Sequence, residues 1–260
     1  MTRRSVFLMY HELESPGRAL VSTEHGYTRY VLAADDFRQH LERLQENGWR
    51  GLTVGHALGQ MEEPEPQPFV AITFDDGCET DFVLAAPLLE EYGARATFYI
   101  IAGRLETRGY LTKAQVRELA ERGFEIGSHS MTHSYLPDLD EGRLRAEIFE
   151  SKARLEEVTG RVVEHFSCPG GRWNRRVSRV AREAGYHTVA TSRFGTNSSQ
   201  ADRFQLARLA VMKGTTAAEF DRLCHAQGLL RRRAQTAALT TAKRLLGNSI
   251  YEKLRAGVLE

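Results

Sequence analysis

Short apolar runs alternate along this chain with stretches of helical periodicity. Val6–Tyr10 and Phe69–Ile72 are continuous apolar runs, typical of strands that are buried on both faces. Phe37, Leu41 and Leu44 recur at helical spacing, and several stretches of this kind end at a glycine. Alternating strands and helices predict βαβ units and a parallel sheet. Six to eight such units suit a closed barrel better than an open sheet.

The pattern also predicts where the individual elements lie. Two segments read as irregular: residues 12–30, which have little periodicity, and residues 62–68, which carry three prolines. Predicted strands lie at 6–10, 52–54, 69–72, 96–101, 124–127, 162–166, 187–190 and 206–211, and predicted helices begin near residues 35, 82, 112, 140, 175 and 217. We therefore expect one domain over residues 1–228.

The last segment, residues 229–260, differs from the rest. Its basic residues far outnumber its two acids, Glu252 and Glu260, and its leucines and isoleucine fall at roughly helical spacing. One interpretation is a helical extension that packs on the domain. The other is a basic amphipathic helical tail that meets a membrane surface or a partner.

Composition excludes several classes of protein. The 260 residues are 42% hydrophobic and 27% charged, as in soluble globular proteins, and the net charge of +1 gives no general attraction to nucleic acid. No window approaches the roughly 18 apolar residues that a membrane helix needs. The first eleven residues hold too short an apolar run for a signal peptide, so we expect a cytoplasmic protein.

The three cysteines, Cys78, Cys168 and Cys224, are odd in number and far apart, which argues against a disulfide framework. Cys78 and Cys168 lie close to the polar motifs described next, where thiolates could ligate a metal. Neither has a C-x-x-C partner, and small buried residues explain both of them adequately.

Asp75 and Asp76 follow the strand predicted at 69–72, and Gly77 ends the motif. Adjacent carboxylates repel each other, so a cation or a shared proton has to compensate them unless they form a solvated turn. His129 and His133 follow another predicted strand and can offer two imidazole nitrogens to a metal. Two histidines and one carboxylate leave coordination positions open, as in a catalytic site.

These motifs, Thr73-Phe-Asp-Asp-Gly77 and His129-Ser-x-x-His133, resemble those of the polysaccharide deacetylases, the NodB-homology group of carbohydrate esterase family four. The similarity continues through Ala86-Pro-Leu-Leu89, Ala96–Ile100 and Phe166-Ser-Cys-Pro-Gly-Gly171, and it covers about residues 5 to 212. The resemblance implies a distorted (β/α)7-type barrel.

The resemblance also implies roles for particular residues. Asp76, His129 and His133 would ligate a divalent metal, usually zinc, and Asp75 would be the general base that takes a proton from water. The backbone N–H of Gly170 would help to bind the oxyanion.

Three departures from the family pattern stand out. Ser167 occupies the position of an arginine that normally orients the base, and Arg172 is a nearby substitute. The usual aromatic residue at the position of Gly170 is absent, which leaves Gly170 and Gly171 open to close approach of a substrate. A C-terminal general-acid histidine is not evident apart from His225.

His11 offers an alternative general acid. Leu8-Met-Tyr-His11 resembles the opening strand of the biofilm poly-N-acetylglucosamine deacetylases, which carry their acid histidine there. We favour His11 over His225, while a histidine that merely closes the strand remains the structural alternative.

The activity that these features imply is metal-dependent removal of an N-acetyl group from an amino sugar, with release of acetate. A cytoplasmic location favours a smaller glycan or a lipid- or nucleotide-linked sugar over cell-wall polymer. Two alternatives are an amidohydrolase that acts on a non-sugar C–N bond, and a degenerate relative that only binds glycan. The missing arginine at Ser167 motivates the degenerate alternative. The oligomeric state is not readable from the sequence.

Overall fold

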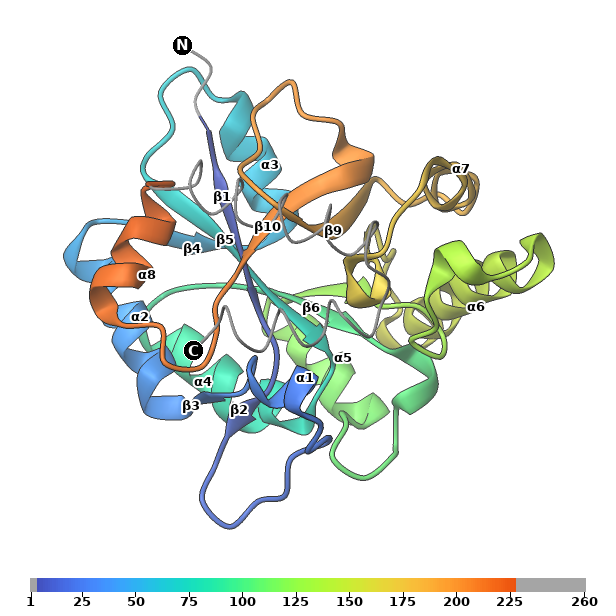
Figure 1. The fold of residues 1–260 in the computed structure, drawn as a ribbon, viewed down its shortest axis with the longest axis horizontal. Helices are drawn as coiled ribbons and strands as arrows, with labels where there is room; N and C mark the ends of the chain where they lie inside the picture. Colours follow the sequence, from blue (N-terminus) through green and yellow to red (C-terminus); the bar gives the residue numbers. More distant parts are fainter. Residues whose placement is uncertain (1–3, 228–260) are drawn as a thin grey trace, which may run out of the picture.

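The computed structural model describes residues 4–227 of the chain (Figure 1). The helical extension predicted for residues 229–260 lies outside the described residues, and the domain boundary at residue 228 stays a prediction. No helix among the described residues is both long and apolar enough to cross a bilayer.

Seven parallel strands close into a barrel. Around the ring they follow the order β1-β10-β9-β8-β7-β6-β5, and β1 pairs with β5 to close it. An eighth strand, β4, lies outside this ring. It pairs with residues 69–71 of β5, along the same edge of β5 that pairs with β6 from residue 73 onward. The strands are β1 (Val6–Tyr10), β4 (Arg50–Leu52), β5 (Phe69–Asp76), β6 (Thr97–Ile100), β7 (Glu125–Ser128), β8 (His165–Ser167), β9 (Thr188–Phe194) and β10 (Leu206–Ala210). The (β/α)7-type barrel is confirmed.

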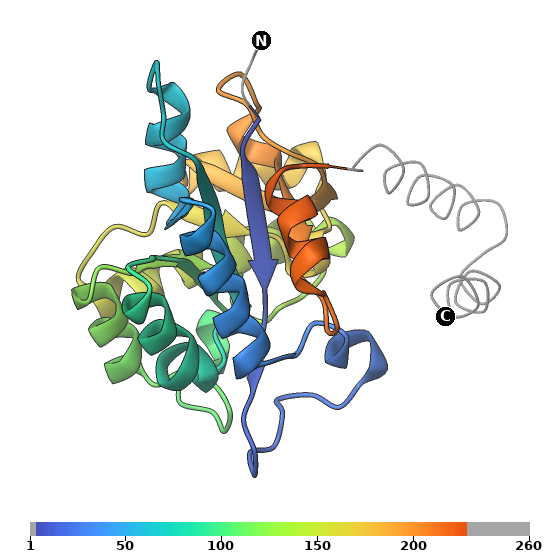
Figure 2. The same ribbon diagram turned by 90° about the vertical axis from the view of Figure 1, so that its left-hand side faces the viewer.

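Helices surround the barrel, and their ends carry ordinary capping residues. Thr112, Asp140 and Thr216 each accept a backbone hydrogen bond at a helix N-terminus. Figure 2 shows α2 and α8 on either side of β1, where His40 stacks on Phe220 at 4.2 Å between ring centroids. The helices are α1 (His25–Thr28), α2 (Ala34–Glu46), α3 (Val54–Glu62), α4 (Ala86–Glu91), α5 (Lys113–Glu121), α6 (Glu141–Thr159), α7 (Arg175–Glu183) and α8 (Ala217–Cys224).

The sequence pattern was wrong about residues 52–54. The strand β4 ends at Leu52, and Val54 begins α3, because the side chain of Thr53 caps that helix by accepting from the N–H of His56. Two glycines in α3 weaken the helical signal. The segment 12–30 also holds more structure than expected, since β2 (Leu13–Glu14) pairs with β3 (Leu32–Ala33) and α1 lies between them.

Alternation along the strands separates two sets of buried side chains. Val6, Leu8 and Tyr10 of β1 join the large core that includes the helices. Phe7 belongs to a smaller cluster with Ala71 of β5, which residues of α3 also join. Because side chains alternate between faces, Thr73 and Asp75 share the face of Ala71. Polar groups thus enter the barrel interior near the C-terminal ends of its strands.

Candidate active site

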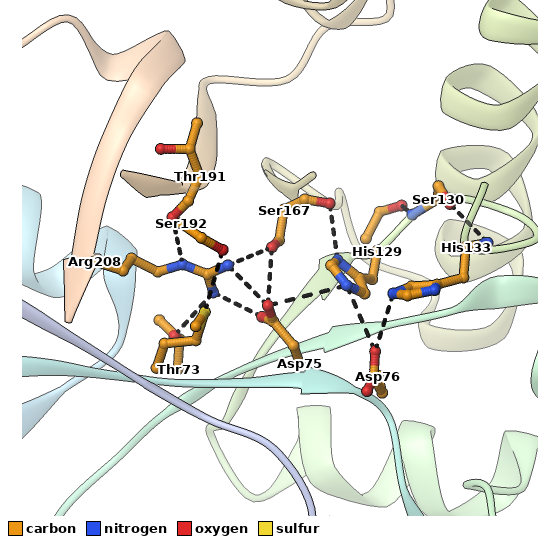
Figure 3. Close-up of polar contacts among 12 residues, drawn as sticks. Thr73, Asp75, Asp76, His129, Ser130, His133, Ser167, Thr191, Ser192 and Arg208 are labelled. Carbon is orange, nitrogen blue, oxygen red and sulfur yellow. Dashed lines mark hydrogen bonds and ion pairs between the residues drawn. The ribbon is translucent and has the colours of Figure 1, made fainter. Parts of the chain in front are cut away.

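The sequence motifs meet at the C-terminal ends of neighbouring strands. Asp75 and Asp76 are the last residues of β5, His129 directly follows β7, and Ser167 ends β8. Figure 3 shows these side chains converging with that of Arg208, which comes from β10. In barrels of parallel strands this end carries the chemistry.

Asp76, His129 and His133 form a candidate metal centre. The Nε2 atoms of both histidines lie 3.5 Å from Oδ1 of Asp76 (Figure 3). Ligands at about 2.0–2.1 Å from a tetrahedral zinc ion lie roughly 3.3 Å from one another, so this spacing suits a metal. Oδ1 of Asp76 is buried and has no hydrogen-bond partner among the described residues. These three residues are the one group of potential ligands with such spacing in the part of the chain that the structure describes.

Both histidines are held in the neutral form, which is the form that can bind a metal. Burial lowers the pKa of His129 to about 3 and also lowers the pKa of His133. Nδ1 of His129 donates to the carbonyl oxygen of Ser167 at 2.9 Å, because a carbonyl can only accept. This contact fixes the orientation of the ring. It leaves Nε2 unprotonated, with its lone pair directed toward Asp76.

The loop that carries the histidines is anchored by Glu147 of α6. Its carboxylate accepts hydrogen bonds from the backbone N–H groups of Met131 and Thr132, both at 2.9 Å, and from the Thr132 hydroxyl at 2.5 Å. Glu147 is buried, so these contacts are shielded from water. Glu147 is absent from the site residues predicted from the sequence. Its place on the mostly apolar buried face of α6 is the local signal that could have identified it.

Backbone strain gathers at the same place. Asp76, Ser130 and His133 all have positive φ, at 83°, 67° and 67°. A non-glycine residue in such a conformation costs on the order of 1–3 kcal/mol and persists only where its surroundings enforce it. Two of these three strained residues, Asp76 and His133, are candidate metal ligands.

Asp75 is held by Arg208, a residue that was not predicted to belong to the site. Nη1 and Nη2 of Arg208 donate to its two carboxylate oxygens at 2.7 and 2.8 Å. The remaining donors of this guanidinium reach Thr73 Oγ1, Ser167 Oγ and the Thr191 carbonyl, so all five of its N–H groups have acceptors. Arg208 is 1% exposed.

The arginine keeps Asp75 ionised. Burial acts to raise the pKa of Asp75, but the charge of Arg208 and its hydrogen bonds outweigh burial and hold the pKa well below its usual range. Asp76 has no such partner. Burial, reinforced by the charge of Asp75, raises the pKa of Asp76 to about 6. The two adjacent carboxylates therefore have different environments.

Arg172 does not take the place of the missing arginine. Its guanidinium lies 3.8 Å from the centroid of the Tyr135 ring and 3.4 Å from a carboxylate oxygen of Asp138. The suggestion that Arg172 orients Asp75 is wrong, because Arg208 of β10 makes the contacts to Asp75 instead. The signal in the sequence was an arginine within the apolar run Leu206-Ala-Arg-Leu-Ala210, since a buried charge demands a partner.

Gly170 and Gly171 lie in the loop after β8, both with positive φ. A Cβ atom on Gly171 would come within 2.2 Å of Ser192 Oγ, so only glycine lets this loop pack on β9. The loop therefore runs close to the strand ends, as expected for a segment that presents backbone N–H groups to a substrate.

His11 lies at the site, and His225 does not. A charged His11 lowers the pKa of both Asp75 and Asp76, which places it within electrostatic reach of them. Its ring stacks on Tyr30 at 4.8 Å, and its buried Nδ1 has no hydrogen-bond partner among the described residues. His225 follows α8 and packs on Trp49, which precedes β4 at the opposite end of the barrel.

Both cysteines beside the site are buried thiols. Burial raises the pKa of Cys78 and of Cys168, so neither is a ready thiolate. Neither joins the candidate metal group in the described part of the chain. Their roles as small core residues agree with the simpler interpretation.

The chain is similar in sequence to the proteins of one family. Residues 62–189 match the family model of polysaccharide deacetylases. YxkH of Bacillus subtilis, a protein named for the same family, is 29% identical over 82% of this chain and 73% of its own length. The peptidoglycan-N-acetylglucosamine deacetylase of Bacillus cereus is 36% identical over 50% of this chain, and the match spans 60% of that enzyme.

A solved structure shares the fold across nearly the whole described chain. The deacetylase PplD of Streptococcus pyogenes, in complex with acetate, superimposes with a TM-score of 0.76 at 23% identity, over 86% of this chain and 99% of that one. Fold and sequence thus define a barrel enzyme of the carbohydrate esterase type. The chain belongs to the NodB-homology polysaccharide deacetylases.

Proposed function

We propose that this protein hydrolyses the N-acetyl amide of an amino sugar in a reaction that depends on a divalent metal, and that it releases acetate. The observation that carries the proposal is the pairing of two differently tuned carboxylates. Asp76 faces His129 and His133, while Asp75 faces Arg208. Relatives named as peptidoglycan and chitooligosaccharide deacetylases support sugar amides as the substrate.

Asp76, His129 and His133 would hold the metal. When bound, a divalent ion, most suitably zinc for two imidazoles and one carboxylate, polarises an amide carbonyl and lowers the pKa of water toward about 7. The unpartnered Oδ1 of Asp76 and the 3.5 Å spacing of the donor atoms support this assignment.

The other residues handle protons and orientation. Asp75 would accept the proton of the attacking water, as its carboxylate stays ionised and is held in place by Arg208. The Gly170 N–H would stabilise the oxyanion that forms on the carbonyl oxygen. As the C–N bond breaks, His11 would donate a proton to the leaving nitrogen, giving a free amine and acetate.

The substrate that we propose is a small glycan or a lipid- or nucleotide-linked sugar. This choice of substrate rests on the cytoplasmic location expected from the sequence. The tail at residues 229–260 is the segment that we propose to contact a membrane or a partner. If deletion of residues 229–260 left both membrane association and activity unchanged, this part of the proposal would fail.

Two alternatives have different support. Hydrolysis of a non-sugar C–N bond uses the same residues, so only substrates distinguish it. A degenerate protein that merely binds glycan was suggested by the absent arginine at Ser167. Arg208 now supplies a guanidinium to Asp75, with Ser167 Oγ as a shared neighbour, so that argument for degeneracy loses its basis.

Metal analysis combined with acetate release from a panel of N-acetylated sugars tests the proposal. Asp75→Asn should retain the metal and lose turnover, whereas the matched variant Asp76→Asn should lose the metal as well. Bound metal with no acetate release from any amino sugar would favour the non-sugar amidohydrolase. Loss of metal in Asp75→Asn would mean that the roles of the two aspartates are reversed.

A further inference from the structure

The Tyr135 ring lies against Gly170. A Cβ atom on Gly170 would come within 2.8 Å of Cε1 of Tyr135 and 3.5 Å of its Cδ1. Side-chain growth at position 170 is therefore blocked by this ring. A ring from a different loop thus occupies the space beside Gly170.

Neighbouring contacts hold Tyr135 in place. Leu136, the next residue, is fully buried, and the Tyr135 carbonyl accepts from the Asp138 N–H at 3.0 Å. The Arg172 guanidinium lies 3.8 Å from the ring centroid and pairs with Asp138 at 3.4 Å. A guanidinium over an aromatic ring is attracted by the negative face of that ring. The ring is therefore oriented before any ligand arrives.

Tyr135 is also close to the chemistry. It comes two residues after His133, and two residues span at most about 7 Å between Cα atoms. It touches Gly170, whose N–H is the proposed oxyanion donor. Despite these contacts Tyr135 is 46% exposed, and among the described residues it is the only aromatic side chain in the group of exposed large hydrophobic residues, which also contains Val83 and Val162.

We propose that Tyr135 contacts the substrate, and that its exposed surface packs against a pyranose ring of an N-acetylated amino sugar. Tyr135 thereby supplies the aromatic surface that Gly170 lacks, and Arg172 is a positioning residue that orients the ring. A rigid aromatic with an exposed surface suits the apolar face of a sugar, and its hydroxyl suits the sugar's polar edge. This inference rests on the proposed function, because it assigns the substrate contact of that same site.

The first test measures steady-state acetate release by Tyr135→Ala and Tyr135→Phe. A contact between two aromatic rings, which we take as the scale for a ring on a sugar, contributes about 0.5–1.5 kcal/mol, or roughly a 2- to 13-fold change. We expect Tyr135→Ala to raise KM for N-acetylated chitooligosaccharides by that factor with kcat and metal content nearly unchanged. Tyr135→Phe should recover most of the loss. The control is Val162→Ala, because Val162 is an exposed apolar residue a few positions before β8, at the opposite end of the strands from the site.

A second test uses binding and is independent of turnover. In the Asp75→Asn background, Tyr135→Ala should weaken equilibrium binding of a chitooligosaccharide by a similar factor, and Arg172→Met should weaken it less. An unchanged KM and unchanged binding in Tyr135→Ala would overturn the inference. A loss of metal or a lowered Tm in Tyr135→Phe would also overturn it, since that points to a structural role. Failure of the proposed function differs, because no variant would then release acetate.

Discussion

Arg208 and Asp75 meet inside the barrel, joined by two hydrogen bonds of 2.7 and 2.8 Å between guanidinium and carboxylate, and their strands both pair with β1. They are 133 positions apart in the sequence, on β10 and β5, and both are almost fully buried. A bidentate pair fixes the carboxylate in orientation as well as in charge. The general base that we propose is therefore positioned by an arginine on β10, outside the motifs that carry the resemblance.

Removing this arginine should change the pH dependence of the reaction. Without the guanidinium, burial would dominate and raise the pKa of Asp75, so the carboxylate would protonate at higher pH. We expect the acid limb of the kcat/KM profile of Arg208→Met to move upward by at least one pH unit. Arg208→Lys keeps the charge without the bidentate contact and should show a smaller shift.

The same variant should lose stability. An uncompensated buried charge costs about 3–5 kcal/mol, which urea unfolding at neutral pH would detect. If the acid limb of the kcat/KM profile of Arg208→Met stays at the wild-type pH, whatever the stability of the variant, then Arg208 does not lower the pKa of Asp75. Arg182→Met is a matched control, because its pair with Asp202 is exposed.

Removal of metal should destabilise the protein and abolish turnover. A ligand that binds only the folded state stabilises it by RT ln(1 + [L]/Kd), about 4 kcal/mol at a thousandfold excess over Kd. We expect chelation to lower Tm, and added zinc to restore it in wild type but not in His129→Ala. His187→Ala serves as the control, because that histidine is exposed and pairs with Glu164. A Tm that ignores both chelator and zinc would contradict the candidate metal centre.

Replacing the proposed general acid should reduce kcat far more than KM. Proton transfer by a positioned side chain contributes roughly 10²- to 10⁴-fold, so His11→Ala should lose that factor. His225→Ala, at the other end of the barrel, should behave as wild type. The reverse result would exchange the two assignments.

Tyr30 offers a finer test of the same residue. His11 stacks on Tyr30, and its Nδ1 lacks a hydrogen-bond partner among the described residues, so the stack is what orients the ring. Tyr30→Ala should therefore lower kcat, and Tyr30→Phe should retain it. Equal kcat in both variants would show that Tyr30 has no positioning role.

His40 predicts a loss of stability in mild acid. Burial lowers its pKa to about 4, below the value of about 6.5 for an unfolded histidine. The unfolded state then binds the proton more readily, so this contribution is complete above pH 6.5 and is lost as the pH falls toward 4. A difference of about 2.5 pKa units, at roughly 1.4 kcal/mol each, corresponds to about 3.5 kcal/mol in full, of which about 3 kcal/mol is lost by pH 4.

The measurement compares the free energy of unfolding of wild type and His40→Gln between pH 7 and pH 4 with zinc present throughout. The wild type should lose more stability than the variant over this range. Parallel curves would assign the acid sensitivity to other groups.

The amino-acid sequence by itself determined the fold class and most of the candidate site. Alternation of apolar runs with helical repeats requires a parallel sheet, and Asp75, Asp76, His129 and His133 are recognisable because each motif is contiguous and follows a strand. Contiguous residues keep their mutual geometry once the strand forms. Local chemistry could therefore be inferred without knowing how the barrel closes.

Only the tertiary structure decided what surrounds those motifs. Arg208 reaches Asp75, and Tyr135 reaches Gly170, through contacts between elements far apart in sequence. Nothing local specifies such a contact, since it depends on which strands become neighbours and on how their side chains alternate. The pairing of β1 with β5 and β10 closes the ring, turns Arg208 inward and gives the base its partner.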